Sequence, residues 1–361
     1  MSATESRTVQ AEGILDIETN ERLHVLTGAV CNNNCLFCME EDREGRYRHN
    51  SAITAADVRE LLEKNVGRGE VMFTSGEPTL NPDFLRHVAH ARKLGYRTIG
   101  VITNGRLFSR PKVAARAVRA GLNHAVVSIH GSTAKLHERL VRTPGAFDET
   151  LAGIRQLAQY RRLGLRLHTR TVLTRQNHDS DELRALHRML GPHVDQMILN
   201  VIQPWGRGET HFERLVPRHS DVARSFAEFV GEFDEPPPVF LIDIPYCTTE
   251  GLGIPDFNRG YIERYVHHDV LEEGPLQLDQ LGAEVDGEQP GGALAKLVAE
   301  LGEGEIAEGA FSGSTRDVQD QLTKVKDARC SECRYDGVCD GVWRNYVRRH
   351  GWDEIQPVGA S

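Results

Sequence analysis

Three cysteines near the N-terminus carry the strongest chemical signal of the sequence. Cys31, Cys35 and Cys38 lie in the stretch C-N-N-N-C-L-F-C-M, separated by three and then two residues. A loop this short can turn three thiolates towards one inorganic body, and thiolates are the usual ligands of iron–sulfur clusters. A cubane cluster has four irons, so three ligands leave one iron open for a reactant, as in a catalytic metal site. We therefore expect a catalytic cluster here.

Two other interpretations of this loop are weaker. A structural zinc site has four closed ligands, and the next His or Cys after Cys38 is His49, which is too distant for the usual second ligand pair. Three buried and inert cysteines are uncommon at such density. The cluster is the preferred interpretation.

The C-x3-C-x2-C spacing, with Phe37 directly before the last cysteine, resembles that of the radical S-adenosylmethionine (radical SAM) enzymes. In that family the amino and carboxylate groups of the methionine part chelate the open iron. The resemblance implies a [4Fe–4S] cluster with an open iron, S-adenosylmethionine as cosubstrate, and Phe37 at the cofactor site.

A second motif, F-T-S-G-E-P-T-L, spans residues 73–80. Glycine lets the backbone approach a ligand closely, and Glu77 adds a negative charge, although G-E-P alone would fit an ordinary strand-to-helix turn. In the resembled family a G-G-E-P motif at this place hydrogen-bonds the ammonium group of the cosubstrate. Ser75, which replaces the first glycine, is therefore a candidate cofactor-binding residue together with Gly76, Glu77 and Pro78.

The third and fourth predicted strands end in I-T-N-G and V-S-I-H-G. Alternate residues of a strand share a face, so Ser128 and His130 should point the same way. If that face is the lumen of a barrel, both lie near Asn104. The resemblance makes Asn104 a cofactor-binding candidate and assigns Ser128 to the methionine carboxylate or the ribose.

The fifth and sixth strands add further polar candidates. Arg166, His168 and Arg170 share one parity, and an arginine inside a barrel is costly unless an anion relieves it. The resemblance makes Arg170 a second candidate for the carboxylate or ribose, whereas Arg166 and His168 could equally lie on the helix side or near the rim. On the sixth strand, Gln203 precedes a glycine-containing turn that suits adenine contact in this family.

Asn200 and Gln203 have opposite parity, so both cannot face the lumen of one regular strand. Trp205, in the turn that follows, could equally be a packing residue.

The second cysteine group lies near the C-terminus, in Cys330-x2-Cys333-x5-Cys339-x-Gly341. It resembles the start of the SPASM/twitch-like auxiliary-cluster extension of many radical SAM maturases. In that pattern a further cysteine follows, at the place that Trp343 occupies here.

The seven cysteines divide into three for the catalytic loop and four for at most one auxiliary site. Cys247, the fourth, follows a predicted strand end and stands in place of the paired upstream cysteines of the extension. We expect a second [4Fe–4S] cluster, with a closed four-thiolate zinc site as the alternative because the two share ligands. Metal-like spacing and an odd count indicate metal rather than disulfides.

The elements that position these residues alternate between strand and helix. Six strands are predicted, over 23–30, 70–74, 98–103, 125–130, 165–173 and 196–203. Five helices are predicted between them. Thr54 caps the first, Asn81-Pro82 starts the second, and the third begins at Pro111 and ends at Gly121. The fourth and fifth span about 147–162 and 179–190. This alternation predicts a parallel sheet with right-handed crossovers. Sequence pattern leaves open sheet and barrel undecided, and the resemblance favours an α/β fold with a partial (β/α)6 TIM-type barrel, active at the strand carboxyl ends.

We expect three regions: an N-terminal tail over 1–22, the radical SAM partial barrel over 23–235, and a C-terminal extension with the auxiliary site over 236–361. After the barrel we expect a helix over 220–233 and a strand ending at Ile244. Residues 248–325 are rich in Gly, Asp and Glu and carry no motif that we can translate.

Composition limits the function further. The chain has 361 residues, 39% hydrophobic and 26% charged, with a formal net charge of −9. A soluble globular protein is expected, and the negative charge argues against a general nucleic-acid or anionic-membrane binder. Neither a signal peptide nor an apolar run of transmembrane length is present. We therefore expect a cytoplasmic protein.

The resemblance implies a radical SAM oxidoreductase or maturase that cleaves its cosubstrate reductively and abstracts a hydrogen atom from a substrate. A peptide or protein is the expected substrate, although the short N-terminal tail leaves no room for a fused leader-peptide domain. A sugar, cofactor or natural-product precursor is the alternative. Flavodoxin or ferredoxin is the expected electron donor.

Two other classes compete. A non-catalytic iron–sulfur carrier or electron-transfer protein would not need the G-E-P segment or lumen-facing polar residues. An RNA-modifying radical SAM enzyme is disfavoured by the acidic balance and by the absence of an appended RNA-binding module.

Overall fold

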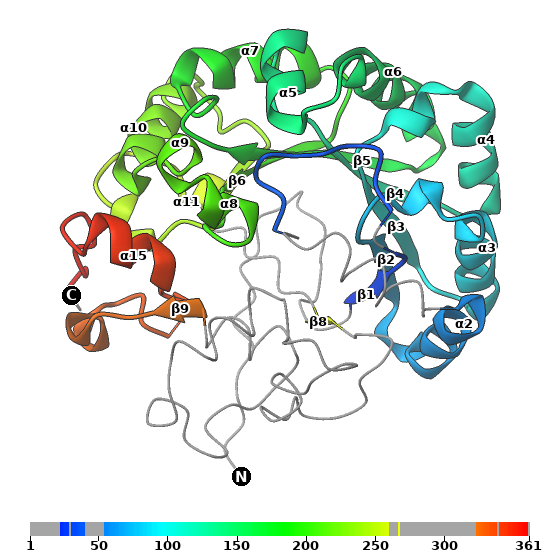
Figure 1. Cartoon of the computed structure of the whole chain (residues 1–361), viewed down its shortest axis with the longest axis horizontal. Helices are drawn as coiled ribbons and strands as arrows, with labels where there is room; N and C mark the ends of the chain where they lie inside the picture. Colours follow the sequence, from blue (N-terminus) through cyan, green and yellow to red (C-terminus); the bar gives the residue numbers. More distant parts are fainter. Residues whose placement is uncertain are drawn as a thin grey trace.

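A curved parallel sheet, covered on its outer face by helices, forms most of the protein (Figure 1). The structure, a computed structural model, describes residues 22–28, 30–39, 54–259, 266–267, 323–337 and 339–359. The strands are β1 (Arg22–Leu26), β2 (Glu70–Thr74), β3 (Thr98–Thr103), β4 (His124–Ser128), β5 (Arg166–Leu173), β6 (Gln196–Val201), β7 (Val239–Ile242) and β8 (Val266–His267). Their order is β7-β6-β5-β4-β3-β2-β1-β8, and every pair is parallel. Among the described strands β7 and β8 are the two edges, so the barrel is partial, as predicted.

The helices connect the strands on the outside of the sheet. They are α2 (Ala55–Lys64), α3 (Phe84–Leu94), α4 (Pro111–Ala120), α5 (Ala134–Val141), α6 (Ala146–Ala158), α7 (Ser180–Leu190), α8 (Arg207–Thr210), α9 (Phe212–Leu215), α10 (His219–Val230), α11 (Asp256–Arg259) and α15 (Arg344–His350). Short 3-10 helices are η1 (Val66–Arg68), η2 (Pro78–Leu80), η3 (Arg106–Ser109), η4 (Arg161–Leu163), η5 (Tyr246–Thr248) and η6 (Ala328–Glu332). No helix in the described part of the chain is long and apolar enough to cross a membrane.

Local sequence explains where these helices begin and end. Thr54 and Asp57 form the predicted capping box, in which each side chain accepts a hydrogen bond from the other residue's main chain. Asp179 accepts from the main-chain N–H of Glu182 and caps α7. Gly121 ends α4 as expected. The helix predicted over about 147–162 ends earlier, at Ala158, and a 3-10 turn at Arg161–Leu163 follows.

The described sheet contains two parallel strands, β7 and β8, besides the six predicted before residue 235. Val239–Ile242, which the sequence analysis placed in the C-terminal extension, pairs with β6 in the same parallel sense. The expected boundary at residue 235 stays a prediction, because the sheet itself continues past it.

The two faces of the sheet differ in chemistry. The helix-covered face is apolar, and Phe73, Val101 and Leu167 belong to its core. The alternate residues face the interior, where Arg22 pairs with Glu70 at 3.2 Å and is only 1% exposed. A buried polar layer thus fills the barrel near the amino ends of its strands.

Arg166 and His168 belong to this polar layer rather than to the helix-covered face. Arg166 donates to Thr98 at 2.8 Å, and the ring nitrogens of His124 and His168 lie 3.3 Å apart. They share a face with Arg170, as strand parity predicted, but lie towards the opposite end of β5 from the catalytic edge.

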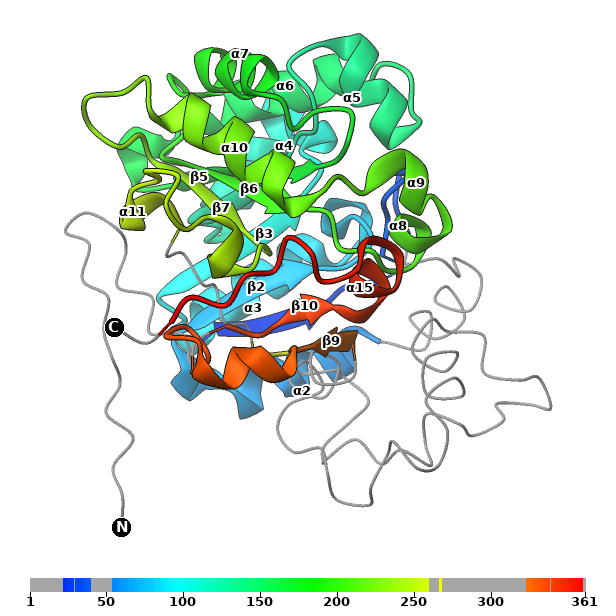
Figure 2. The same cartoon turned by 90° about the vertical axis from the view of Figure 1, so that its left-hand side faces the viewer.

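The C-terminal cysteine segment packs on the flank of the barrel formed by α8 to α11 (Figures 1 and 2). Its strands β9 (Lys324–Val325) and β10 (Val342–Trp343) pair antiparallel. The Tyr346 hydroxyl accepts from the His219 main-chain N–H at 2.9 Å, donates to Glu354, and its ring stacks on the His219 imidazole with centroids 3.9 Å apart. These contacts fix the segment to the start of α10.

Candidate functional site

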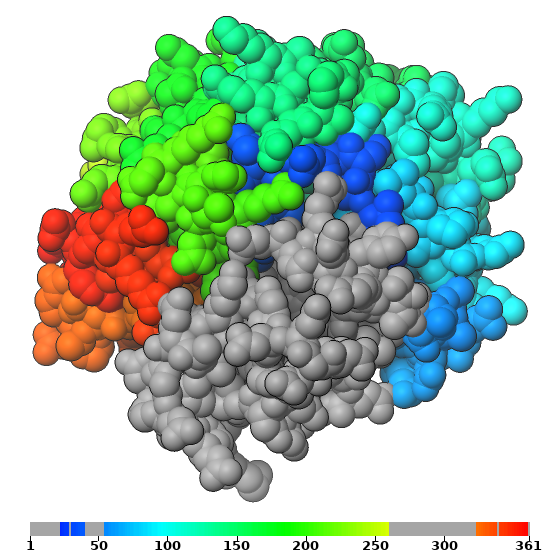
Figure 3. Space-filling view, viewed as in Figure 1, coloured from blue at the N-terminus to red at the C-terminus, as the bar shows by residue number. Residues whose placement is uncertain are grey.

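The cysteine loop crosses the carboxyl-end edge of the sheet, directly after β1. Its main chain is bonded to the end of α5, since the N–H groups of Asn34 and Leu36 donate to the carbonyls of Val141 and Leu140, both at 2.9 Å. Figure 3 shows the blue atoms of this segment between cyan and green atoms of the barrel. The loop is therefore a docked part of the fold.

The three thiols lie close enough to influence one another. Burial raises the pKa of the Cys35 thiol, and the charges of Cys38 and Cys31 raise it further, whereas Arg207 lowers it. The main-chain N–H of Asn33 lies 3.4 Å from the Cys31 sulfur. Because neighbouring thiolates repel one another, a shared positive centre would stabilise them. Three such thiols match the ligand set of an iron–sulfur cluster.

Glu77 lies beneath the loop with its carboxylate fully engaged. Its Oε1 accepts from the hydroxyls of Thr79 and Thr103, both at 2.6 Å, and from the Thr79 N–H at 3.1 Å. Its Oε2 accepts from the Asn104 N–H at 2.7 Å, and its own N–H donates to the Val30 carbonyl at 2.8 Å. Burial still raises the pKa of this carboxyl. The geometry favours a positioning role, and direct contact with an ammonium group stays a prediction.

Ser75 and Gly76 both adopt the left-handed backbone region, with φ of 72° and 56°. Only glycine enters this region without steric cost. The bend they create turns the chain from β2 into η2, which begins at Pro78. Glycine would suit this left-handed conformation at position 75, and Ser75 adopts it at a steric cost.

Asn104 connects the end of β3 to the cysteine loop. Its side-chain Nδ2 donates to Asn32 Oδ1 at 2.6 Å and lies 4.0 Å from the Cys31 sulfur. The residue is buried, with 8% of its surface exposed. The structure thus brings Asn104 to the cysteines.

Phe37 of the cysteine loop contacts the end of β4 through His130. Its ring packs edge-on against His130, with centroids 4.7 Å apart. His130 accepts the Val172 N–H at Nδ1, at 3.1 Å, and burial keeps its pKa well below the usual value. A neutral His130 is thus a packing partner for the loop.

Ser128, the last residue of β4, is the direct neighbour of Arg170, which lies in the middle of β5. Both residues lie on the interior face of the sheet, opposite the apolar core. Their contact with a methionine carboxylate or ribose stays a prediction.

Gln203 lies beyond the end of β6, so strand parity does not constrain it. Both Gln203 and Asn200 donate their side-chain amides to Asp243 Oδ2, Gln203 at 2.8 Å. The sequence argument that these two side chains must diverge held only for a regular strand. Asp243, with φ of 58°, is a polar residue at the end of β7 that sequence reasoning missed.

The C-terminal cysteines and Cys247 form a second group of interacting thiols. The pKa of Cys247 is raised to about 11, mainly by burial and also by the charges of Cys339, Cys333 and Cys330. The Cys339 sulfur accepts from the Gly341 N–H at 3.4 Å and the Cys333 sulfur from the Val358 N–H at 3.3 Å. Such N–H···S contacts stabilise thiolates. Cys247 therefore interacts electrostatically with the trio, and its role as a fourth ligand stays a prediction.

All seven cysteines are free thiols. Within the described ranges, no three His, Cys, Asp or Glu side chains converge to a closed metal-binding geometry. The presence of a metal at either group, and its identity, stay predictions.

Trp343 occupies the place of a further cysteine in the resembled extension. It is 5% exposed and packs in an apolar cluster that also contains Leu36 and Phe37 of the cysteine loop. Cys35 and Cys247 pack against the same cluster. One apolar cluster therefore joins the two cysteine groups.

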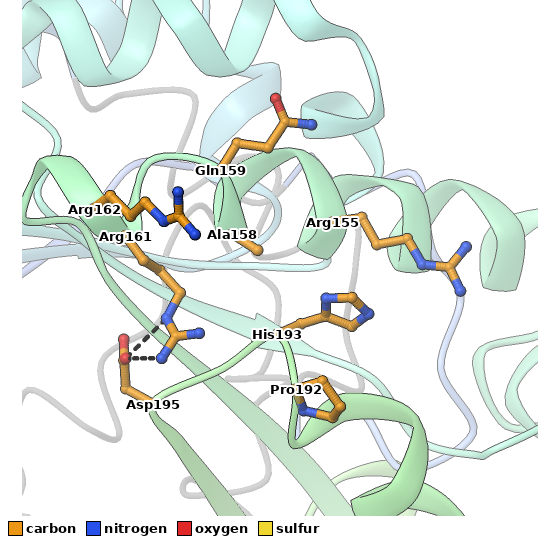
Figure 4. Close-up of a pocket in the computed structure, with 8 residues that line it drawn as sticks. All are labelled: Arg155, Ala158, Gln159, Arg161, Arg162, Pro192, His193 and Asp195. Carbon is orange, nitrogen blue, oxygen red and sulfur yellow. Dashed lines mark hydrogen bonds and ion pairs between the residues drawn. The ribbon is translucent and has the colours of Figure 1, made fainter.

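A large surface hollow lies at the other end of the barrel, before β5 and β6 (Figure 4). It measures about 780 Å³ and is lined by Arg155, Arg161, Arg162, His193 and Asp195, among others. Asp195 accepts from Arg161 Nε at 2.8 Å and from the Leu167 N–H at 2.8 Å. Because the hollow lies at the amino ends of the strands, we do not assign it to the reaction site.

Comparison with known proteins agrees with this arrangement. Residues 25–187 match the model of the radical SAM superfamily, a span that includes all three loop cysteines, the G-E-P segment and Asn104. This span of the chain is therefore similar to the radical SAM superfamily, and it contains the cysteine loop and strands β2 to β5.

Curated relatives include the probable GTP 3′,8-cyclase of Saccharolobus islandicus, 29% identical over 213 residues, which are 58% of this chain and 64% of the relative. The match therefore spans less than two thirds of that relative. Streptococcus suis SuiB bound to S-adenosylmethionine matches in structure with a TM-score of 0.57 at 16% identity, over 94% of this chain and 76% of SuiB. The anSMEcpe structure with bound AdoMet and Cp18Cys peptide matches with a TM-score of 0.55 at 13% identity, over 94% and 93%. The two structural matches support the α/β partial-barrel fold of this protein.

Sequence reasoning missed two arginines that contact the cysteine loop. Arg106 follows I-T-N-G directly, and Arg207 follows the glycine turn after Gln203. Both lie beside segments that the motifs had identified, so adjacency to a motif was the available signal.

Proposed function

We propose that this protein is a radical SAM enzyme. The observation that carries the proposal is the placement of Cys31, Cys35 and Cys38 over the strand carboxyl ends, with the Glu77–Asn104 unit beneath them. When bound, a [4Fe–4S] cluster at these thiols would supply the electron that cleaves S-adenosylmethionine to a 5′-deoxyadenosyl radical, which abstracts a hydrogen atom from the substrate.

The chain's own residues hold and orient the reactants. Ser75 and Gly76 turn their main chain beside the loop, where main-chain groups can contact the methionine ammonium. Ser128, at the end of β4, and its neighbour Arg170 on β5 are the proposed contacts for the carboxylate or ribose. Gln203, anchored to Asp243, lies at the end of β6 for the adenine side.

The substrate is proposed to be a peptide or protein. Support comes from the C-terminal cysteine segment on the barrel flank, together with the SuiB structure bound to precursor peptide SuiA, which matches 94% of this chain with a TM-score of 0.57 and 15% identity. A small-molecule substrate is the second candidate, which the GTP 3′,8-cyclase relatives favour. A flavodoxin or ferredoxin is the proposed electron donor.

The group of Cys247, Cys330, Cys333 and Cys339 is proposed as an auxiliary [4Fe–4S] site. The mutual effect of these thiols and the main-chain N–H groups directed at their sulfurs support a four-thiolate centre. A closed zinc site has the same ligands and remains the alternative.

The test of the function is cosubstrate cleavage. Anaerobically reconstituted protein with dithionite and S-adenosylmethionine should form 5′-deoxyadenosine, and replacement of Cys31, Cys35 or Cys38 by Ala should abolish it. Formation of the product by any of these variants, or its absence from the wild-type protein with a full iron complement, would refute the proposal.

A further inference from the structure

Arg207 binds the main chain of the cysteine loop from the end of β6. Its guanidinium donates to Asn34 Oδ1 at 2.7 Å and to the Cys35 carbonyl at 2.9 Å, and its own N–H donates to the Cys38 carbonyl at 3.0 Å. The preceding Gly206 has a φ of 56°, and a Cβ there would lie 2.2 Å from the Met39 carbonyl oxygen. The two segments therefore fit together without room for a larger residue.

Arg106 binds the same loop from the end of β3. Its Nη1 donates to the Asn32 carbonyl at 2.6 Å and to Asn33 Oδ1 at 3.1 Å. Its Nε donates to Glu149 at 2.6 Å. Two arginines thus hold one loop of fewer than ten residues: Arg106 binds it between Cys31 and Cys35, and Arg207 binds it from Asn34 to Cys38.

The two arginines differ in whether a neighbouring carboxylate neutralises their positive charge. Glu149 neutralises Arg106, whereas no carboxylate in the described part of the chain pairs with Arg207. Three thiolates and a [4Fe–4S] core carry net negative charge, which increases when an electron is added. A cation that no carboxylate neutralises stabilises the reduced form more than the oxidised form, because the Coulomb attraction grows with the charge, and net charge and hydrogen bonding set the potentials of such clusters.

We propose that Arg207 is a positioning residue that raises the reduction potential of the cluster held by Cys31, Cys35 and Cys38, whereas Arg106 anchors the loop without changing that potential. The inference rests on the proposed function, since it presumes a cluster at these thiols. The turn after β6, which carries Arg207, thus controls how readily the cluster accepts an electron.

Potentiometric titration monitored by electron paramagnetic resonance, at low ionic strength, tests the proposal on anaerobically reconstituted full-length protein. Arg207→Gln should shift the midpoint of the loop cluster to a more negative potential. Arg207→Lys, which keeps the charge, should stay near wild type. The double variant Arg106→Gln with Glu149→Gln removes a neutral pair and should also stay near wild type, as the matched control.

A Glu149→Gln variant provides a second, independent measurement, because it leaves the loop contacts of Arg106 in place and frees its charge. Its midpoint should shift to a more positive potential, even if Arg207→Gln proves unable to hold iron. Equal midpoints in all variants with full iron content would overturn the inference alone. A wild-type protein that forms no [4Fe–4S] cluster would instead overturn the proposed function with it.

Discussion

The main-chain N–H of Asn104 donates to Glu77 Oε2 at 2.7 Å, and this bond joins two motifs that lie 27 residues apart. The same Asn104 donates through its side chain to Asn32 of the cysteine loop. The G-E-P segment, the end of β3 and the cysteine loop are therefore one hydrogen-bonded unit. A substitution at Glu77 should therefore disturb the structure of all three segments.

Glu77→Gln should lower the free energy of unfolding by about 1.5–3 kcal/mol, the usual cost of disturbing hydrogen bonds to a buried charged group. The amide has one oxygen to accept with, while the native carboxylate receives four hydrogen bonds on two oxygens. Urea unfolding measures the loss. The control is Glu60→Gln, at an exposed carboxylate that pairs with Lys64 on α2.

Cosubstrate affinity separates the two roles of Glu77. If the carboxylate also contacts the ammonium group directly, affinity for S-adenosylmethionine should fall about ten- to a hundredfold while the iron content stays unchanged. Loss of stability with little change in affinity would support positioning instead. Unchanged stability and unchanged affinity together would contradict both roles.

Sequence identified Glu77 as a site residue but could not supply its partners. Thr103 and Asn104 become partners only because β2 and β3 are adjacent in the sheet. Likewise, parity placed Arg166 and His168 on one face correctly, but the pairing with Thr98 and His124 depends on strand register. The roles of Arg106 and Arg207 could not be predicted for the same reason, because their acceptors belong to a loop that is distant in the sequence. Motifs reveal the residues that the chemistry requires, and the fold decides which residues hold them.

Ser75→Gly should raise the free energy of unfolding, by up to about 1 kcal/mol. A non-glycine residue with φ of 72° bears a steric cost of about 1–2 kcal/mol, part of which the greater backbone freedom of glycine in the unfolded chain offsets. Gly76→Ala, at φ of 56°, should lower it by about 1–2 kcal/mol. Chemical unfolding compares both with wild type, and a destabilised Ser75→Gly variant would show that the serine side chain contributes more than its backbone costs.

The buried histidine pair should make the protein sensitive to acid. Burial lowers the pKa of His168 to about 3, helped by Arg166, and holds the pKa of His124 well below the usual value. Between about pH 6.5 and pH 3 the unfolded chain binds protons that the folded protein excludes, so stability is retained above pH 6.5 and lost as the pH falls. His168→Gln should reduce this loss by up to about 1.4 kcal/mol per pH unit. Urea unfolding at pH 7.5, 6.0 and 5.0 gives the slopes, and identical slopes for wild type and variant would rule out this contribution.

The last prediction separates the two cysteine groups. If both hold [4Fe–4S] clusters, reconstituted protein should contain about eight irons, and the variant lacking Cys31, Cys35 and Cys38 should keep about half. That variant should retain a cluster absorption band and lose all cosubstrate cleavage. Cys247→Ala should remove iron from the second site and leave the loop cluster, because the Cys247 thiol lies among Cys330, Cys333 and Cys339.

Metal analysis distinguishes the alternatives for that second site. Zinc in the purified protein, with iron at the loop alone, would contradict an auxiliary cluster and favour a structural clasp. Full iron retention in Cys247→Ala would instead exclude Cys247 as an essential ligand and leave an iron open to a reactant. Because Cys35 and Cys247 pack against one apolar cluster, a zinc clasp would still hold the catalytic loop in place, so 5′-deoxyadenosine formation by the zinc-loaded protein would be consistent with a purely structural role.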